Sequence, residues 1–383
     1  MKVVFGRSFL LHVIPPITDI IAWKFLAILF SVQLIFHWVL PHDDVIVLSS
    51  IKEYRRAVNG FSSCLLLCLL YLMGSGLGLY RGDTVFIHFN AIVLYLALIC
   101  ACIMTTLVLT YRFGEDYNMI SVTTLSDFFF GVEIHPKVLD IDIKHFLRSR
   151  ITFGLWPLFV ISALFYQRNA YGQISMSLLG CSFVQMTYIM KFHWNEYLHL
   201  NALDSRRANC GFYRVWGDLV FYPIIYSSPL AIIAYSRKTL SILTNAIYVI
   251  IGLFAIYTTT AIDKQKYDFR RSKGMIKIGG VDPFFITAKY RLDTGDSAAN
   301  LLLGSGYWSS CRHPNYLFES ITFMSFSLFQ GFAPALCHLP AIFITGFLFV
   351  RLLSDESRCL AKYGQYWIQY CNKVPYRVLP GIY

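Results

Sequence analysis

Apolar stretches long enough to cross a membrane recur along most of this chain, and no other feature restricts its fold as strongly. A helix needs about 18 or more mostly apolar residues to span the hydrocarbon core of a bilayer. The chain has 383 residues, of which 56% are hydrophobic and 14% are charged. In an average soluble domain about a quarter of the residues are charged. The sequence therefore predicts a polytopic membrane protein.

The spans can be placed by length and composition. We expect membrane-spanning helices at residues 17–40, 61–80, 84–111, 151–166, 174–192, 215–235 and 240–261. Residues 318–350 are long enough for two more helices, with a break near residues 331–334. The predicted fold class is all-α, with about eight to ten transmembrane helices embedded in the lipid bilayer.

Charge and cysteine content support this class and exclude others. The net charge is +11, and its cations gather in short loops between spans, as in the run from Lys264 to Lys277. By the positive-inside rule these loops face the cytosol. The basic charge has no recognised nucleic-acid-binding fold beside it, so we expect no nucleic-acid partner. The ten cysteines form no C-x-x-C pair and no disulfide framework, which suits a reducing cytosolic face.

The one long polar stretch between expected spans is residues 263–299. Lys266 and Arg270 stand four residues apart within it, so on a continuing helix both lie on one face. Two such cations can bind a phosphate, although anchoring to anionic lipid is the alternative. Alternating residues 284–290 and the turn residues at 279–280 and 293–295 predict a short hairpin. A loop of this length in a compact domain is usually functional.

Three clusters of charged, amide and aromatic residues lie beside apolar stretches near the C-terminus, at residues 305–316, 354–364 and 374–383. Ionisable groups at membrane depth usually face a cavity and mark a ligand path. Gly304-Ser305-Gly306 lacks the third glycine and the βαβ context of a dinucleotide fingerprint. Any dinucleotide must therefore bind in a pocket between helices.

The order of these motifs resembles a known family. W-x-x-x-R-H-P-N-Y from Trp308, then D-E-x-R-C, K-Y-G-x-x-W and V-P-Y-R-x-x-P-G-I-Y, is similar to the C-terminal half of the sterol reductases. R-H-P-x-Y alone also resembles isoprenylcysteine methyltransferases and steroid 5-reductases, but residues 127–137 resemble the sterol reductase element D-F-F-x-G-x-E-x-x-P-R. The resemblance covers about residues 59–383. It implies a single membrane domain, with an N-terminal transmembrane bundle at 12–262 and an NADPH-binding half at 263–383.

The resemblance also implies a sterol substrate, NADPH as cofactor and a set of site residues. The implied cofactor-binding residues are Lys266, Arg270, Trp308, Arg312, His313, Asn315, Tyr316, Asp355 and Tyr363. The implied substrate-binding residues are Glu196, Asp218, Tyr226 and Glu319. Asp355 and Tyr226 are the implied catalytic residues.

The chemistry of such a reduction requires an acid. An alkene cannot stabilise a carbanion, so it must be protonated before a nicotinamide delivers hydride. In a 5,7-diene, a proton on carbon 8 leaves an allylic cation that hydride can quench at carbon 7. Burial raises the pKa of a carboxyl group and keeps it protonated at neutral pH. We expect Asp355 to deliver the proton, relayed through Tyr226, and Glu356 to form a structural pair with Arg358.

Within the family, the stretch from Tyr226 to Pro229, the loop at 263–274 and the C-terminal ending resemble the Δ7-reductases. They imply reduction of the Δ7 bond of a 7-dehydrosterol by a multi-pass protein of the endoplasmic reticulum membrane. Ser354 and Ser357 depart from the family pattern. Three alternatives remain: a Δ14-sterol reductase, a catalytically inactive sterol-binding protein, and a membrane methyltransferase that uses S-adenosylmethionine.

A metal site is a further possibility that the residues themselves raise. His193, Glu196 and His199 are spaced over about a third of a helix circumference, as ligands can be. Iron-dependent membrane hydroxylases need many more histidines than the ten present. We expect no metal, and the sequence makes no prediction of the oligomeric state.

Overall fold

The computed structural model describes residues 18–47, 54–112, 124–202, 205–206, 208–236, 239–291, 295, 297–331 and 335–382. The chain divides into two compact units. Unit 1 comprises Met1–His42, Asn59–Glu196 and Ala202–Thr239. Unit 2 comprises Asp43–Val58, Tyr197–Asn201 and Leu240–Tyr383. The predicted boundary between a bundle at 12–262 and a cofactor-binding half at 263–383 stays a prediction.

Among the described residues, six helical segments are long and apolar enough to cross a membrane. They are Ile20–Val39, Phe89–Tyr111, Ile143–Tyr171, Phe212–Ser236, Ile242–Arg271 and Ala335–Tyr363. The other expected spans are also helical, at α3 (Gly60–Gly76), α9 (Met176–Trp194) and α15 (Pro314–Leu328). The predicted class of a mainly helical, polytopic membrane protein is therefore confirmed. The break expected in the last apolar stretch falls between α15 and α16 (Leu339–Tyr363), although residues 332–334 lie outside the described residues.

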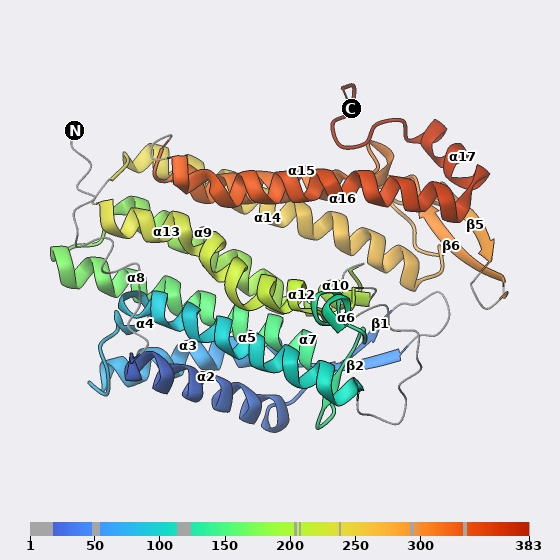
Figure 1. The fold of residues 1–383 in the computed structure, drawn as a ribbon. Helices are drawn as coiled ribbons and strands as arrows, with labels where there is room; N and C mark the ends of the chain where they lie inside the picture. The colour runs from blue at the N-terminus through green and yellow to red at the C-terminus, as the bar shows by residue number, and fades with distance from the viewer. Residues whose placement is uncertain are drawn as a thin grey trace. The chain divides into compact units, whose positions relative to one another are not determined.

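Unit 1 is a bundle of helices (Figure 1). Its further helices are α2 (Ile20–Val39), α4 (Thr84–Ile87), α5 (Phe89–Arg112), α6 (Thr124–Phe130), α7 (Ile143–Phe146), α8 (Phe153–Tyr171), α12 (Phe212–Trp216) and α13 (Tyr222–Ser236), and α10 (Glu196–Leu200) begins at its edge. Strands β3 (Lys137–Val138) and β4 (Ile141–Asp142) pair before α7. Asp142 caps α7, since its carboxylate accepts a hydrogen bond from the backbone of His145 at 2.9 Å.

Two π-helical turns interrupt the helices of unit 1, at Leu147–Thr152 and Gly217–Phe221. The first joins α7 to α8 and the second joins α12 to α13, and the two turns pack against each other. Thr152 Oγ1 donates to the backbone carbonyl of Asp218 across this contact at 2.6 Å. A π-helical turn shifts the helical register and so redirects the side chains that follow it. Here both turns direct charged side chains into the interior, including Arg150 and Asp218.

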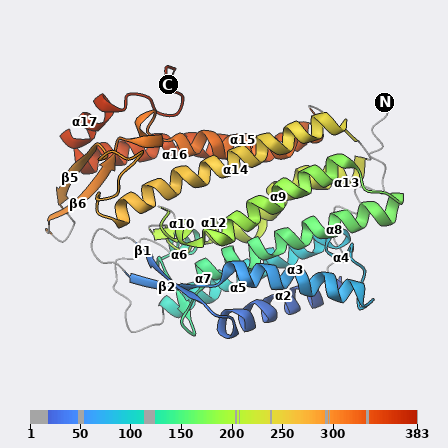
Figure 2. The ribbon, with the colours of Figure 1, turned by 180° about the vertical axis from the view of Figure 1, so that it is seen from behind.

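Unit 2 is built on three long helices. The 30-residue helix α14 (Ile242–Arg271) packs on α15, which packs on α16 in both views (Figures 1 and 2). A helix of this length spans about 45 Å, which exceeds a hydrocarbon core by about 15 Å. The polar end of α14, with Lys266 and Arg270, is therefore free to lie on the aqueous side. Strands β1 (Asp43–Val47) and β2 (Tyr54–Val58) form a separate antiparallel pair.

The hairpin predicted in the long polar stretch is confirmed. Strand β5 (Phe285–Arg291) pairs antiparallel with β6 (Ser297–Leu303), in a register that joins Phe285 to Leu303; the turn residues Asp293 and Thr294 lie outside the described residues. The hairpin packs on α17 (Gln365–Lys373), as Figure 2 shows. Its buried face contributes to a cluster of Ala288, Tyr290, Leu302, Tyr363, Trp367, Tyr370 and Val374.

Candidate functional site

The polar end of α14 brings together the first two predicted cofactor-binding residues of unit 2. Lys266 Nζ lies 3.9 Å from the centroid of the Trp308 ring, a distance at which a cation is attracted to an aromatic face. Trp308 is buried, and its Nε1 donates to the carbonyl of Ile262 at 3.2 Å. Arg270 follows Lys266 by one turn of the same helix. Both residues lie on α14, four residues apart, so their side chains leave the helix on the same face, as the spacing predicts.

A glycine makes the approach of Trp308 to α14 possible. Gly306 has a φ of +63°, and a Cβ atom there would lie 2.5 Å from Nε2 of Gln265. Gln265 Oε1 accepts a hydrogen bond from the backbone of Tyr307 at 3.0 Å. The left-handed backbone favours glycine, and a Cβ atom there would also require the Gln265 side chain to move. The turn at Gly306 therefore fixes the loop that carries Trp308 onto α14.

The start of α15 carries three more predicted residues. The ring of His313 stacks on that of Tyr316, with centroids 4.8 Å apart. Asn315 Nδ2 donates to Asp263 Oδ1 at 2.9 Å, which ties α15 to α14. The Tyr316 hydroxyl donates a hydrogen bond to Asp355 Oδ2 at 3.1 Å. The structure thus brings the predicted acid Asp355 together with Tyr316, on the neighbouring helix of unit 2.

Several buried polar atoms in this region have no hydrogen-bond partner among the described residues. They include Arg270 Nε, His313 Nε2 and Asn315 Oδ1. Burial lowers the pKa of His313 to about 3, with help from the positive charges of Lys266 and Arg312, so its imidazole is neutral at physiological pH. Buried polar groups are almost always paired, and unpaired ones call for an explanation. A bound ligand with several polar groups would satisfy them.

The remaining predicted residues of unit 2 have different surroundings. Tyr363 accepts a hydrogen bond from Asn300 Nδ2 at 2.8 Å and meets Tyr290 edge to face. Arg312 is buried and bonded within the protein, to Glu356 and to backbone carbonyls. Glu356 therefore pairs with Arg312 instead of the expected Arg358. Glu319 lies half-buried on α15, and its predicted role in sterol binding stays a prediction.

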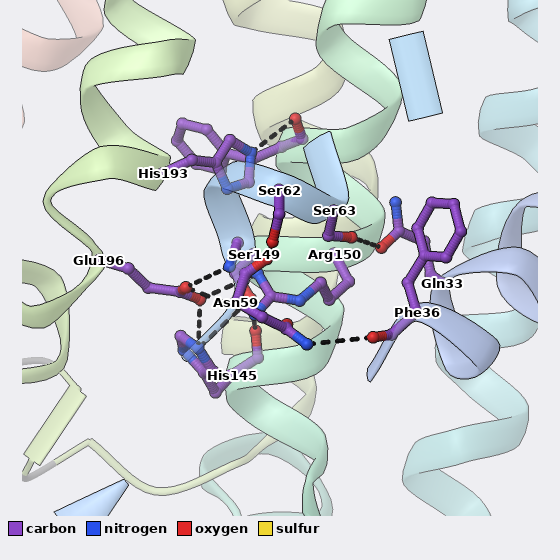
Figure 3. A network of polar contacts seen from close by, with 12 residues as sticks. Gln33, Phe36, Asn59, Ser62, Ser63, His145, Ser149, Arg150, His193 and Glu196 are labelled. Carbon is purple, nitrogen blue, oxygen red and sulfur yellow. Dashed lines mark hydrogen bonds and ion pairs between the residues drawn. The ribbon is translucent and has the colours of Figure 1, made fainter. Parts of the chain in front are cut away.

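Unit 1 contains a second polar centre, around Glu196. Figure 3 shows its carboxylate, at the start of α10, facing His145 and Arg150. Glu196 Oε1 lies 2.7 Å from His145 Nε2 and 2.9 Å from Arg150 Nη1. Glu196 Oε2 accepts from the backbone N–H of Gly60 at 2.9 Å. Arg150 also donates to Asn59 Oδ1 at 3.0 Å, so three separate segments of the chain meet at one ion pair.

The ion pair is deeply buried, with Arg150 at 3% and Glu196 at 2% exposure. Burial alone would raise the pKa of the Glu196 carboxyl group, but the positive charge of Arg150 and the hydrogen bond from His145 hold it well below its ordinary value. Glu196 is therefore an anion at neutral pH. A Cβ atom on Gly60 would lie 2.5 Å from Glu196 Oε2, so the network also requires glycine at that position.

Asp218 and Tyr226 also belong to unit 1. The carboxylate of Asp218 is buried and lies 3.4 Å from Arg148 Nε and 3.2 Å from Arg214 Nε. Tyr226 is buried on α13, where its ring stacks on Tyr222 with centroids 5.0 Å apart. The expected relay from Asp355 through Tyr226 joins residues of different units and stays a prediction.

Sequence reasoning did not identify the partners of Glu196. Among the described residues, no group of three or more His, Cys, Asp or Glu side chains is arranged to hold a metal ion. His193, one turn before Glu196, has its Nε2 3.3 Å from the carbonyl of Phe153. The cation that neutralises Glu196 lies 46 residues earlier, at Arg150. The resemblance assigned no role to Arg150, and no spacing rule connects it to Glu196.

Comparisons with known proteins cover both units. A model of the Ergosterol biosynthesis ERG4/ERG24 family matches residues 7–383. A 7-dehydrocholesterol reductase of Arabidopsis thaliana is 31% identical over 378 residues, which covers 96% of this chain and 86% of the relative. A 7-dehydrocholesterol reductase of Xenopus laevis is 32% identical over 258 residues, 67% of this chain and 54% of the relative. A Delta(14)-sterol reductase of Mus musculus is 26% identical over 342 residues, 87% of this chain and 78% of the relative.

Proposed function

Since the chain belongs to the ergosterol biosynthesis ERG4/ERG24 family, we propose that it is an NADPH-dependent sterol reductase of the endoplasmic reticulum membrane. The observation that carries the cofactor assignment is the group of unpaired buried polar atoms at the joined ends of α14 and α15. Arg270 Nε, His313 Nε2 and Asn315 Oδ1 offer both donor and acceptor positions. A dinucleotide carries phosphates and a carboxamide that could satisfy them.

The residues of unit 2 suit NADPH in charge as well as in hydrogen bonding. Lys266 and Arg270 would hold its phosphates, and Asn315 would bind the carboxamide or a phosphate. Trp308, His313, Tyr316 and Tyr363 would line the remainder of the cofactor pocket. When bound, the nicotinamide supplies the hydride. No ion pair ties Lys266 to a carboxylate among the described residues, which suits a cation that binds an anionic ligand.

Asp355 is the proposed proton donor. Its protonated carboxyl group gives the proton to one carbon of the alkene, and hydride then adds to the resulting cation. The Tyr316 hydroxyl, 3.1 Å from Asp355 Oδ2, would stabilise the carboxylate that remains. Solvent returns the proton for the next cycle. Glu196, Asp218, Tyr226 and Glu319 are the residues we propose for the sterol, with Tyr226 as a proton relay.

The proposed bond is Δ7 of a 7-dehydrosterol. A relative aligned over 86% of its own length is named a 7-dehydrocholesterol reductase, which supports this choice. The mouse relative named a Delta(14)-sterol reductase supports the alternative of Δ14 reduction. In an 8,14-diene the intermediate cation lies elsewhere in the ring system. One pocket should therefore place one of the two substrates correctly against the nicotinamide.

Isotope labelling tests the reaction and the bond together. Purified protein is incubated with Δ7, Δ14 and Δ24 sterols and deuterium-labelled NADPH, and the products are analysed by mass spectrometry and NMR. We expect reduction of the 7-dehydrosterol, with the cofactor's deuterium at carbon 7. In heavy water with unlabelled NADPH, deuterium should appear at carbon 8. Reduction confined to an 8,14-diene would select the Δ14 alternative, and sterol binding without reduction would select the inactive binding protein.

Substitution of the α14 cations tests the cofactor site. Lys266→Ala and Arg270→Ala should each raise the Michaelis constant for NADPH by about tenfold or more, because a hydrogen bond to a charged group contributes about 1.5–3 kcal/mol. Steady-state kinetics at saturating sterol measures the change. Lys264→Ala is the matched control, since it removes an exposed cation from the same helix. Binding of S-adenosylmethionine without binding of NADPH would contradict the assignment and favour the methyltransferase.

A further inference from the structure

The Arg312 side chain forms hydrogen bonds with a carboxylate and with two backbone carbonyls of the protein. Its Nε donates to Glu356 Oε1 at 2.6 Å. Its Nη1 donates to the carbonyls of Val374 and Pro375 at 2.9 and 2.8 Å. The guanidinium thus lies buried between α16 and the segment that follows α17. A guanidinium fork can hold a carboxylate and backbone carbonyls at the same time, whereas the ammonium group of a lysine is a point charge.

The backbone beside Arg312 is held by the same C-terminal segment. The N–H groups of Arg312 and His313 donate to the carbonyls of Tyr376 and Arg377 at 2.9 and 2.8 Å. Arg377 Nε in turn donates to Glu356 Oε2 at 2.8 Å. Both oxygens of Glu356 are therefore engaged, one by each arginine. We call Arg312, Glu356 and residues 374–377 the clasp.

The clasp joins the two helices that carry the proposed proton donor and its partner. Arg312 lies four residues before Tyr316 at the start of α15, and Glu356 directly follows Asp355 on α16. The hydrogen bond between Tyr316 and Asp355 forms only if these helices keep their separation. The Arg312–Glu356 ion pair, 2.6 Å between Nε and Oε1, spans the same two segments.

We propose that Arg312 and Glu356 are positioning residues, and that the clasp holds Tyr316 and Asp355 in the geometry for proton delivery. This role rests on the proposed reductase function and replaces the expected role of Arg312 as a direct cofactor ligand. The charge of Arg312 is already balanced by Glu356, and three of its hydrogen bonds go to the protein. Of the five N–H donors of the guanidinium, only the two on Nη2 remain for another ligand.

The two roles predict different effects of Glu356→Gln on kcat, and of Arg312→Gln on the Michaelis constant for NADPH. If Arg312 bound a phosphate, removal of the neighbouring negative charge would leave NADPH binding unchanged or tighter. If the clasp positions the donor, Glu356→Gln and Arg312→Gln should each lower kcat by about tenfold or more, because small displacements of catalytic groups have large effects. The Michaelis constant for NADPH should stay within about twofold. The double variant should lose little more than either single variant, as expected for residues that act as a unit.

Hydrogen exchange gives a readout that does not depend on turnover. In both variants the amides of Arg312 and His313 should exchange faster, since their acceptors lie on the released segment. Arg358→Gln, which removes an exposed arginine from α16, is the matched control and should change neither kcat nor exchange. If Arg312→Gln does not fold, Arg377→Gln removes the more exposed half of the clasp.

The outcomes separate the clasp from the reductase function. A large rise in the NADPH Michaelis constant for Arg312→Gln, with normal kcat for Glu356→Gln, would overturn the clasp and make Arg312 a cofactor ligand. Unchanged amide exchange in both variants would also overturn it. A wild-type protein that reduces no sterol would instead contradict the proposed function, and the exchange experiment would still test the clasp.

Discussion

Replacement of Asp355 by asparagine is expected to lower sterol turnover by about a hundredfold or more, while sterol and NADPH still bind. The amide keeps the shape of the carboxylic acid but cannot protonate an alkene. Tyr316→Phe should have a smaller effect, about tenfold, because it removes only the hydroxyl that donates to Asp355 Oδ2. Turnover of the 7-dehydrosterol by purified variants, with binding measured separately, gives both values.

Ser354→Ala is the matched control, because Ser354 is an exposed neighbour of Asp355 on α16. It should leave turnover near the wild-type level, because it removes only an exposed hydroxyl group. Near-normal turnover of Asp355→Asn would contradict its role as the acid. The role would then move to Glu319, Glu356 or Tyr226. Each can be tested in the same way, by a substitution that keeps the shape of the side chain and removes its acidic proton.

The second large effect is expected in unit 1, at the buried pair of Arg150 and Glu196. Arg150→Met should lower the free energy of unfolding by about 3–5 kcal/mol, because it leaves a buried carboxylate without its cation. The double variant Arg150→Met/Glu196→Leu should recover a large part of this loss, since it leaves no uncompensated charge. Chemical unfolding in detergent, followed by tryptophan fluorescence and circular dichroism, measures these differences.

Arg168→Met provides the comparison for this experiment, because Arg168 is an exposed arginine at the end of α8. Its loss should change stability by less than about 0.5 kcal/mol. If Arg150→Met were as stable as Arg168→Met, the three segments around Glu196 would be held by apolar packing alone. Equal instability of the single and double variants would show that the loss comes from altered packing instead of an unpaired charge.

The helices could be predicted from the sequence because a membrane makes local composition decisive. A membrane span must satisfy its backbone hydrogen bonds within itself, so a long apolar stretch in lipid forms a helix. The stretch at 174–192 became α9, and that at 318–350 became α15 and α16. The hairpin at residues 285–303 followed from alternation and turn residues, which are also local signals.

The sequence also placed Lys266 and Arg270 on one face, because a four-residue spacing within a continuous helix determines direction. It could not place Trp308 against that face. Their contact depends on the turn at Gly306 and on the hydrogen bond from Tyr307 to Gln265. The first relation is set within one helix, and the second by how two segments 42 residues apart pack together.

The ion pairs show most clearly which relations the sequence determines and which depend on the tertiary structure. The sequence by itself determined that this chain is a polytopic helical membrane protein and which polar residues stand beside its apolar spans. Only the tertiary structure decided that Glu356 pairs with Arg312 and Arg377, and that Glu196 pairs with Arg150. A charge can be buried only if packing delivers a partner to it, and sequence spacing reports neighbours within a helix but not those that another helix brings.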